Sequence, residues 1–483
     1  MEHRRLLAEA VERGVGSGAS YVEARFGRSR RETMTMSGGD VDAAGTAVDQ
    51  GIGVRLLIDG AWGFAASSIV DNHSVGDLVE QAAAIARRTL ASLTEPAELA
   101  PHDPVQDDVE MLGVIDPASV PLAERIELMR EVHAILMATA GISGTRGHMD
   151  IHRDLMELLT SEGTEITQEI GVVGGGYVAT AENNGTKARR SFPHHGGWDY
   201  ATAGFEWFRE DRFLGSANRI AAEAVTLLKA EACPTTTTTV VLDPAMIGTV
   251  LHETVGHATE LDRILGDERD NFGGSFVTVD RIGSFPYAAP VVTVAADATL
   301  PGGAGSYRYD AEGVAAQRVQ VIEDGVLADA TNSRECAAVL GRRSNGTARA
   351  SAWNRIPMAR MTNVYLEPGD DTLESLIGGV DDGIYIATDA MTDIDDNREL
   401  CSFGGEIGWR IRSGQLAEPI SRPYLYTDTH SLLESCDGIG SADERYVSGI
   451  LGCGKGQPWQ FIFTGQGGPP ARFRNVSVGP PRG

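Results

Sequence analysis

His252-Glu253-Thr254-Val255-Gly256-His257 places two imidazoles and a carboxylate within six residues. Upstream, the β-branched run ending in Val240-Val241-Leu242 predicts a buried strand, and Asp243-Pro244 pairs a favoured N-cap with a favoured first helical residue. The pattern therefore predicts a strand that leads into a helix carrying the two histidines. Histidines can hold a catalytic zinc ion, and a glutamate beside them can take a proton from zinc-bound water.

The spacing of these histidines differs from that of the common H-E-x-x-H zinc helix. Here they are five residues apart, and Gly256 occupies the fourth place. With about 3.6 residues per turn, positions five apart point about 140° apart on a straight α-helix, so both rings cannot reach one ion. We therefore predict that the helix ends or bends at Gly256, or that it contains a π-bulge there. Backbone hydrogen bonding between His252 and His257 should then depart from the α-helical pattern.

A catalytic zinc ion usually has three protein ligands, so two histidines leave one to be found. The candidates are two nearby carboxylates and four more distant side chains: Glu260, Asp262, His430, Cys401, Cys436 and Cys453. Cys453 is the most suggestive, because flanking glycines let the backbone approach an ion and Lys455 can help keep the thiol deprotonated. Such a cysteine is also commonly a small buried hydrophobe, so the residue types leave the third ligand open.

Length and composition indicate a multidomain α+β enzyme. The 483 residues exceed one ordinary core, and 58 glycines with only 6% aromatic residues favour a loop-rich chain over a helical bundle. A proline-rich, acidic stretch near residue 100 predicts a linker. We expect an N-terminal α/β domain (1–105), a middle α/β domain (106–233) and a strand-rich C-terminal domain (234–483) that carries the metal site.

The formal net charge of −27 indicates which partners to exclude. A field of this sign repels nucleic acid and anionic membranes, so we expect neither as a partner. The chain shows no apolar stretch of signal-peptide or membrane-spanning length, and its five cysteines lack paired spacing. We therefore expect a cytoplasmic protein with free thiols.

The chain resembles the TldD/PmbA family of metallopeptidases, and in particular the catalytic, TldD-type members of that family. The resemblance covers nearly the whole length and rests most specifically on the histidine motif and the late Gly452-Cys453-Gly454-Lys455 element. Supporting segments are Tyr21-Val22-Glu23-Ala24-Arg25, Gly51-Ile52-Gly53-Val54-Arg55, Trp62-Gly63-Phe64, Asp310-Ala311-Glu312-Gly313, Ile322-Glu323-Asp324-Gly325-Val326-Leu327 and Arg360-Met361-Thr362-Asn363-Val364.

The resemblance implies a role for each residue of the site. His252, His257 and Cys453 become the ligands of Zn²⁺, and Glu253 becomes the general base. The implied reaction is hydrolysis of peptide bonds in unfolded proteins or small peptides. The implied assembly is a dimer, formed with a second copy or with a non-catalytic TldE/PmbA-type sibling.

Two other functions stay open at this stage. One is an amide hydrolase that acts on a specialised or modified peptide in a biosynthetic pathway. The other is a non-catalytic partner subunit in which the metal is structural, and a fourth protein ligand such as Glu260 or His430 would favour it.

Overall fold

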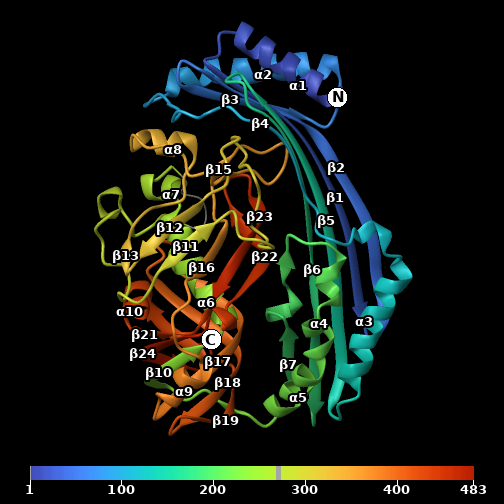
Figure 1. The fold of residues 1–483 in the computed structure, drawn as a ribbon, viewed down its shortest axis with the longest axis vertical. Coiled ribbons are helices and arrows are strands. Elements are labelled where there is room, and N and C mark those ends of the chain that lie inside the picture. Colours follow the sequence, from blue (N-terminus) through green and yellow to red (C-terminus); the bar gives the residue numbers. More distant parts are fainter. Residues whose placement is uncertain (1, 268–272, 483) are drawn as a thin grey trace.

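A long curved sheet with a strand-rich body packed against it makes up the protein, as a computed structural model that describes residues 2–267 and 273–482 shows (Figure 1). The curved sheet comes from the first half of the chain. Its strands are β1 (Tyr21–Ser37), β2 (Asp40–Ile58), β3 (Ala61–Ser67), β4 (Gln106–Met111), β5 (Ile142–Thr160), β6 (Glu165–Asn183), β7 (Thr186–Phe192) and β8 (Tyr200–Ala201). Their order is β3-β2-β1-β5-β6-β4, and β7 and β8 also pair with β6.

Helices cover the two ends of this sheet (Figure 1). They are α1 (Glu2–Gly16), α2 (Asn72–Thr89), α3 (Leu122–Met137), α4 (Asp211–Gly215) and α5 (Ala217–Leu227). One apolar core forms where α1 and α2 pack on β1 and β2, and a second forms where α3 and α5 pack on β5, β6 and β7. Each core therefore anchors one end of the same set of long strands.

Two further sheets form the C-terminal body. The larger contains β9 (Glu231–Ala232), β10 (Thr236–Leu242), β17 (Asp382–Ile394), β18 (Leu400–Arg412), β19 (Gln415–Ser421), β20 (Tyr424–Asp428), β21 (Cys436–Ile439) and β24 (Ala471–Gly479). Its order is β17-β10-β24-β20-β18-β19-β9, with β21 on β24, and β17 also pairs with β18. Five of these strands therefore close into a small barrel.

The other sheet has the order β13-β12-β11-β16-β23-β22. Its strands are β11 (Val294–Asp297), β12 (Arg318–Glu323), β13 (Val326–Leu327), β16 (Asn363–Leu366), β22 (Tyr446–Lys455) and β23 (Gln460–Gly468). The body also contains a short pair, β14 (Ala348–Arg349) and β15 (Met358–Ala359), and five helices. These helices are α6 (Pro244–Leu251), α7 (Leu261–Leu265), α8 (Arg334–Val339), α9 (Leu373–Gly378) and α10 (Thr429–Glu434).

Helix α6 lies between these two sheets, in contact with β17 on one side and β23 on the other. Its apolar residues Ile247, Val250 and Leu251 belong to the largest core, which both sheets share. Since six of its eight residues are buried, the helix is fixed on nearly all sides. This position gives the histidine motif that follows α6 a rigid support.

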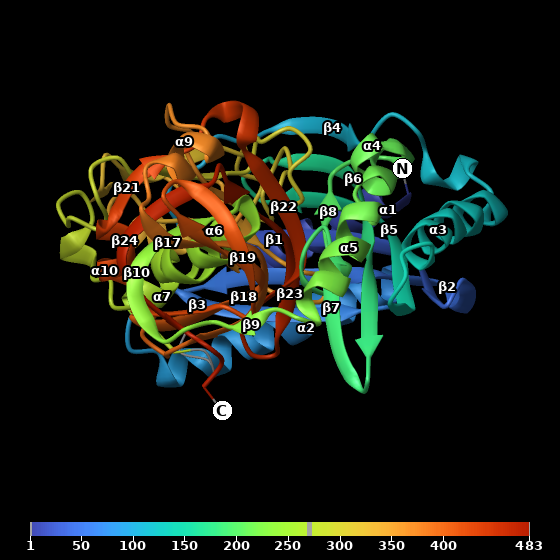
Figure 2. The same ribbon diagram turned by 90° about the horizontal axis from the view of Figure 1, so that it is seen from below.

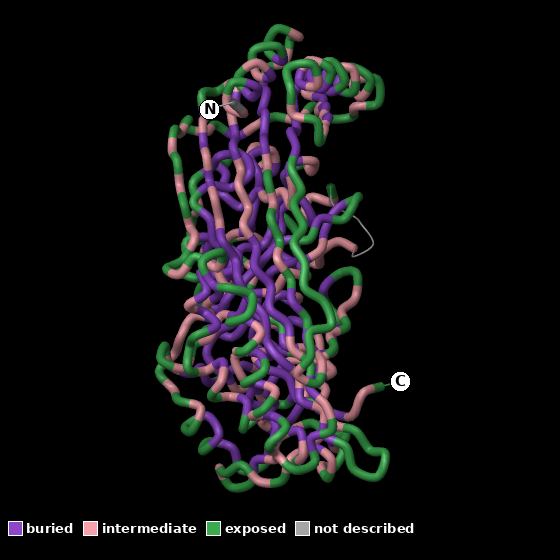
Figure 3. The backbone as a smooth tube through the Cα atoms, turned by 90° about the vertical axis from the view of Figure 1, so that its right-hand side faces the viewer, coloured by how far each residue is buried: buried purple, intermediate pink, exposed green. Residues whose placement is uncertain are grey.

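The curved sheet and the C-terminal body meet through buried ion pairs. Arg55 on β2 lies 3.0 Å from Glu312, and Arg190 on β7 lies 2.6 Å from Glu406 on β18. Strands β22 and β23 lie on the side of the body that faces β7 and β8 (Figures 1 and 2). Buried residues run through the middle of the molecule, whereas exposed residues lie at both ends and along its sides (Figure 3).

The predicted α+β class, with a strand-rich C-terminal part, is confirmed. The expected boundaries at 1–105, 106–233 and 234–483 stay predictions, and the first two segments contribute strands to one continuous sheet. Among the helices of the described residues, none has the length and apolar character needed to cross a bilayer.

Candidate metal centre

The histidine motif begins where α6 ends. The Asp243 side chain caps the helix by accepting a hydrogen bond from the Met246 N–H at 2.8 Å, as the sequence predicts. The α-helical pattern stops at Leu251, and His252–Gly256 form a π-helical turn that a 3₁₀ turn follows at His257. The His257 N–H donates to the His252 carbonyl, five residues back. The predicted departure from α-helical hydrogen bonding is thus confirmed.

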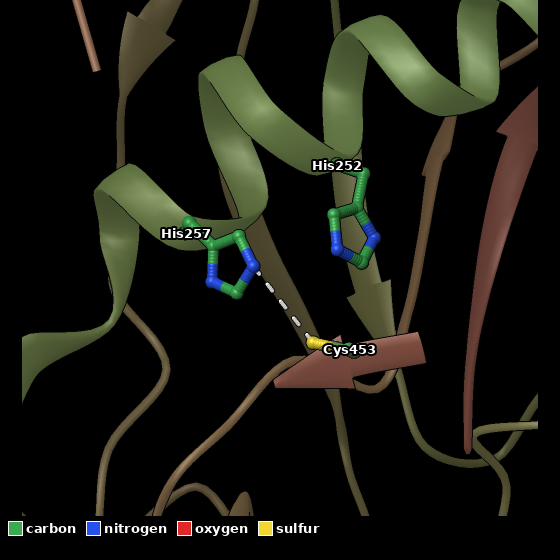
Figure 4. A group of neighbouring side chains, drawn as sticks. All are labelled: His252, His257 and Cys453. Carbon is green, nitrogen blue, oxygen red and sulfur yellow. Dashed lines mark hydrogen bonds between the residues drawn. The ribbon is translucent and has the colours of Figure 1, made fainter. Parts of the chain in front are cut away.

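The wider turn brings the two imidazoles together. Their ring centroids lie 4.9 Å apart with the planes at 87°, and both rings point toward Cys453 (Figure 4). Gly256 has an ordinary helical φ of −55°, so the turn does not need glycine for its backbone conformation. A Cβ at Gly256 would instead lie 1.9 Å from the Sδ of the buried Met361. Glycine is therefore required there by close packing.

Cys453 comes from the edge strand β22, at a bulge in its pairing with β23. Its Sγ lies 3.8 Å from Nε2 of His257, and one donor atom from each of His252, His257 and Cys453 lies within 4.8 Å of the others. Tetrahedral zinc with ordinary Zn–S and Zn–N bonds would separate these two atoms by about 3.6 Å. The spacing therefore fits one ion.

The environment of the three donors also fits a metal. All three residues are buried. Nε2 of His257 and Sγ of Cys453 face each other, and the ring of His252 lies on the same side of the turn (Figure 4). Two imidazoles and a thiolate are donors that bind zinc and other transition metals. No other His, Cys, Asp or Glu cluster of this kind occurs in residues 2–267 and 273–482.

Arg360 is the cation beside the thiol. Its Nη2 lies 3.3 Å from Sγ of Cys453 and donates a hydrogen bond of 2.6 Å to the carbonyl oxygen of the same residue. Burial raises the pKa of Cys453, but the charges of Arg360 and then His257 outweigh burial and hold it well below its usual value. The expectation that Lys455 serves this purpose is wrong, because Lys455 pairs with Asp262 at 2.6 Å instead.

Glu260 orients His257 rather than joining the ligand group. Its Oε2 accepts a hydrogen bond from Nδ1 of His257 at 3.1 Å, which leaves Nε2 to face Cys453. Burial lowers the pKa of His257, yet the negative charges of Cys453 and Glu260 raise it to about 9. Carboxylates that hold a metal-binding histidine in this way fix its tautomer and its direction.

The remaining ligand candidates lie elsewhere. Cys401 and Cys436 are buried thiols near the backbone carbonyls of Thr427 and Gly438, and burial raises the pKa of each to about 12. His430 is half exposed and lies 3.5 Å from Glu434. These three side chains are not part of the cluster.

A cavity of about 710 Å³ opens beside the three donors. Glu253 lines it and is only partly buried, with Oε2 3.3 Å from Nη1 of Arg398. The segment from Ile450 to Gly454 forms one wall, and the middle of the chain contributes another wall. The residues of that second wall are His194, His195, Trp198 and Tyr200.

Sequence reasoning assigned no role to Arg360, although its segment was among those that support the resemblance, and it did not find the wall at 194–200. Both take part in the site through contacts with residues far away in the chain. Three donors at the wall of a cavity, with a carboxylate beside them, define a class of site: one that can hold a metal ion and leave a position open to a further ligand.

The chain belongs to the PmbA/TldA family of metallopeptidases. Residues 22–86 match domain 1 of that family, residues 115–230 match its central domain, and residues 235–480 match its C-terminal domain. These matches cover most of the 483 residues.

Curated relatives are named metalloproteases. One from Methanothermobacter thermautotrophicus is 31% identical over 95% of each chain. A metalloprotease TldD homolog from Haemophilus influenzae is 25% identical over 95% of this chain and 92% of its own. The relatives therefore support a metal-dependent peptidase.

Solved structures share the fold. TldE from Thermococcus kodakarensis superposes with a TM-score of 0.71 at 15% identity, covering 98% of this chain and 100% of its own. A Thermotoga maritima protein, described as a candidate modulator of a DNA gyrase, gives 0.76 at 15% identity over 98% and 99%. At this identity the likeness concerns the fold alone.

Proposed function

We propose that this protein is a zinc-dependent metallopeptidase that hydrolyses peptide bonds of unfolded proteins or small peptides. One observation carries the proposal: His252, His257 and Cys453 converge at the wall of a cavity that Glu253 also lines. The three side chains would hold Zn²⁺. When bound, zinc lowers the pKa of a water molecule and polarises a carbonyl group.

Glu253 is the residue placed to move the proton. It follows a ligand directly in sequence, and its carboxylate reaches the cavity while Arg398 contacts one oxygen. In the proposed reaction Glu253 accepts a proton from the attacking water and passes it to the leaving amine. The buried surroundings of the donors exclude bulk water and strengthen these interactions.

The edge strand β22 supports an extended substrate. It is the last strand of its sheet, and its residues 450–454 line the cavity next to the metal-binding side chains. A peptide that pairs with such an edge is held through its backbone, with little dependence on its side chains. This arrangement favours broad specificity over a strict requirement for one residue.

The test compares the wild type with Cys453→Ala and the matched variant Cys436→Ala, which removes a buried thiol away from the site. We expect about one zinc ion per chain in the wild type and in Cys436→Ala, with hydrolysis of unfolded casein by both. Cys453→Ala should lose both zinc and hydrolysis. Full zinc content and activity in Cys453→Ala would overturn the proposed site.

Glu253→Gln separates the chemistry from metal binding. We expect it to keep its zinc while hydrolysis falls by about 10²- to 10⁴-fold. If hydrolysis persists at the wild-type rate, Glu253 is not the base. A structural role for the metal would require a fourth protein ligand, and the described part of the chain brings only three together.

We further propose a dimer, with a second copy or with a non-catalytic sibling of the same family. Light scattering of the purified chain, alone and mixed with such a sibling, distinguishes the two. A specialised or modified peptide as substrate is the alternative within the same chemistry, and digestion of a peptide library tests it.

A further inference from the structure

A further histidine lines the cavity, and it comes from the middle of the chain rather than from the metal-binding segment. His194 lines the cavity and is 4% exposed. It precedes the short turn His195–Gly197, in the wall that comes from the middle of the chain. A buried polar ring at this position needs a hydrogen-bond partner.

Asp389 holds this ring. The carboxylate Oδ1 lies 2.9 Å from Nδ1 of His194 and accepts its hydrogen bond, while Oδ2 accepts one from the Thr249 hydroxyl at 3.1 Å. Asp389 lies at a bulge in β17, where the N-cap residue Asp243 accepts the N–H of the preceding Thr388 at 2.9 Å. The carboxylate that fixes the ring is thus bonded to α6 through Thr249, and the residue before it is bonded to the N-cap of that helix.

These bonds connect His194 to the helical segment that carries the reacting groups. Thr249 precedes His252 and Glu253 by three and four residues on the same helical segment. Residues so spaced are neighbours on one helix face, about 5–6 Å apart at Cβ. The chain His194–Asp389–Thr249 therefore ends directly beside the metal-binding histidine and the proposed base.

The electrostatics make the ring a donor. Burial lowers the pKa of His194, but the hydrogen bond and charge of Asp389 outweigh it, with Asp199 and Asp243 adding to the effect, so the pKa is raised. With Nδ1–H donated to Asp389, Nε2 carries a second proton when the ring is an imidazolium, the form that the raised pKa favours. Such a fixed, buried donor stabilises negative charge better than water does, because it needs no reorientation.

A matching acceptor stands nearby. Gln466 on β23 also lines the cavity and donates from Nε2 to the Thr249 hydroxyl at 3.2 Å. Its Oε1 is buried and has no hydrogen-bond partner among the described residues. A peptide carries both a carbonyl oxygen and an N–H, so a donor and an unpaired acceptor around Thr249 suit a bound amide.

We propose that His194, held by Asp389, is a further catalytic residue whose Nε2–H binds the scissile carbonyl oxygen as negative charge develops there. This inference rests on the proposed peptidase function. Asp389 is a positioning residue, since it acts through the ring. No covalent bond to His194 forms or breaks in this role, and the proton stays on Nε2.

The test uses zinc-loaded full-length protein, with a peptide substrate and a phosphinic peptide that mimics the tetrahedral transition state. For His194→Gln we expect kcat to fall by about 10²- to 10³-fold with KM little changed. Affinity for the phosphinic peptide, measured by calorimetry, should fall by a similar factor while affinity for the product peptide stays the same. Asp389→Asn should likewise lower kcat and the affinity for the phosphinic peptide.

His430→Gln is the matched control, because His430 is half exposed, lies 3.5 Å from Glu434 and is not among the residues that line the cavity. We expect its kcat to stay within about threefold of the wild type. Zinc content and melting temperature establish that each variant is folded and loaded. A His194→Gln enzyme with wild-type kcat, or with a change in KM alone, would overturn this inference. A zinc-loaded wild type without peptidase activity would instead overturn the proposed function.

Discussion

Gly256→Ala tests why the π-helical turn contains glycine. The new Cβ would lie 1.9 Å from Sδ and 3.0 Å from Cγ of Met361, which is fully buried. Overpacking of this kind typically costs about 1–3 kcal/mol. The φ of −55° is compatible with alanine, so steric conflict is the only source of the penalty.

The penalty should appear as weakened zinc binding. Metal-free protein can relieve the conflict by moving the turn, whereas the metal-bound form fixes His252 and His257 on either side of it. A difference of about 1–3 kcal/mol between the two forms lowers zinc affinity about 5- to 150-fold. Competition with a chromophoric chelator measures this affinity, and calorimetric melting of the metal-free protein measures the remaining strain.

A double-mutant cycle isolates the contact. Met361→Ala alone leaves a cavity in the core. In the double variant this cavity makes room for the methyl group of Gly256→Ala. The double variant should therefore bind zinc more tightly than the sum of the two single effects predicts. Gly378→Ala is the control, since a Cβ there meets nothing within 4 Å. If Gly256→Ala binds zinc as the wild type does, close packing does not explain this glycine.

Three further predictions concern the groups around the ligands. Glu260→Gln should lower zinc affinity by about 10- to 100-fold in the chelator assay, because His257 loses the partner that fixes its tautomer; unchanged affinity would contradict this. The pKa of about 9 for His257 means that zinc must displace its proton at neutral pH. Zinc affinity should therefore rise about tenfold per pH unit between roughly pH 6 and 8 and level off above about 9, and a flat profile would be inconsistent with this coupling. Arg360→Met should raise the pKa of Cys453, so that alkylation of the metal-free thiol moves to higher pH; an unshifted profile would show that Arg360 is not the cause.

Local signals in the sequence predicted the elements that hold the histidines. Asp243 and Pro244 fix the start of α6 by capping and by restricted φ, and these effects need no distant partner. The five-residue spacing of His252 and His257 implied the irregular turn, because two side chains that bind one ion must lie on the same side of the helix. Both inferences depend on short-range physics.

Distant contacts account for what the sequence did not predict. Lys455 stands two residues from Cys453, yet its side chain crosses to Asp262, and Arg360 takes the place expected for it. The side chains of strand β22 alternate between the two faces of its sheet. Which cation lies beside Cys453 on its face, however, depends on how other segments of the chain pack there. The continuous sheet from β3 to β4 was not predicted for the same reason. The sequence of a strand does not show which distant strand it will pair with.

The wall that His194 belongs to is tied to the strand that supplies the thiol. Oδ1 of Asp199 accepts a hydrogen bond from the N–H of Gly449 at 2.8 Å, four residues before Cys453, and its Oδ2 pairs with the hydroxyl of Tyr446. A Cβ at Gly449 would lie 2.1 Å from the carbonyl oxygen of Tyr200, so the contact leaves no room for a side chain. Movement of the middle segment would therefore displace β22 as well. These contacts couple the two walls of the cavity, so we expect a substrate that enters between them to leave the thiol and the histidines in place.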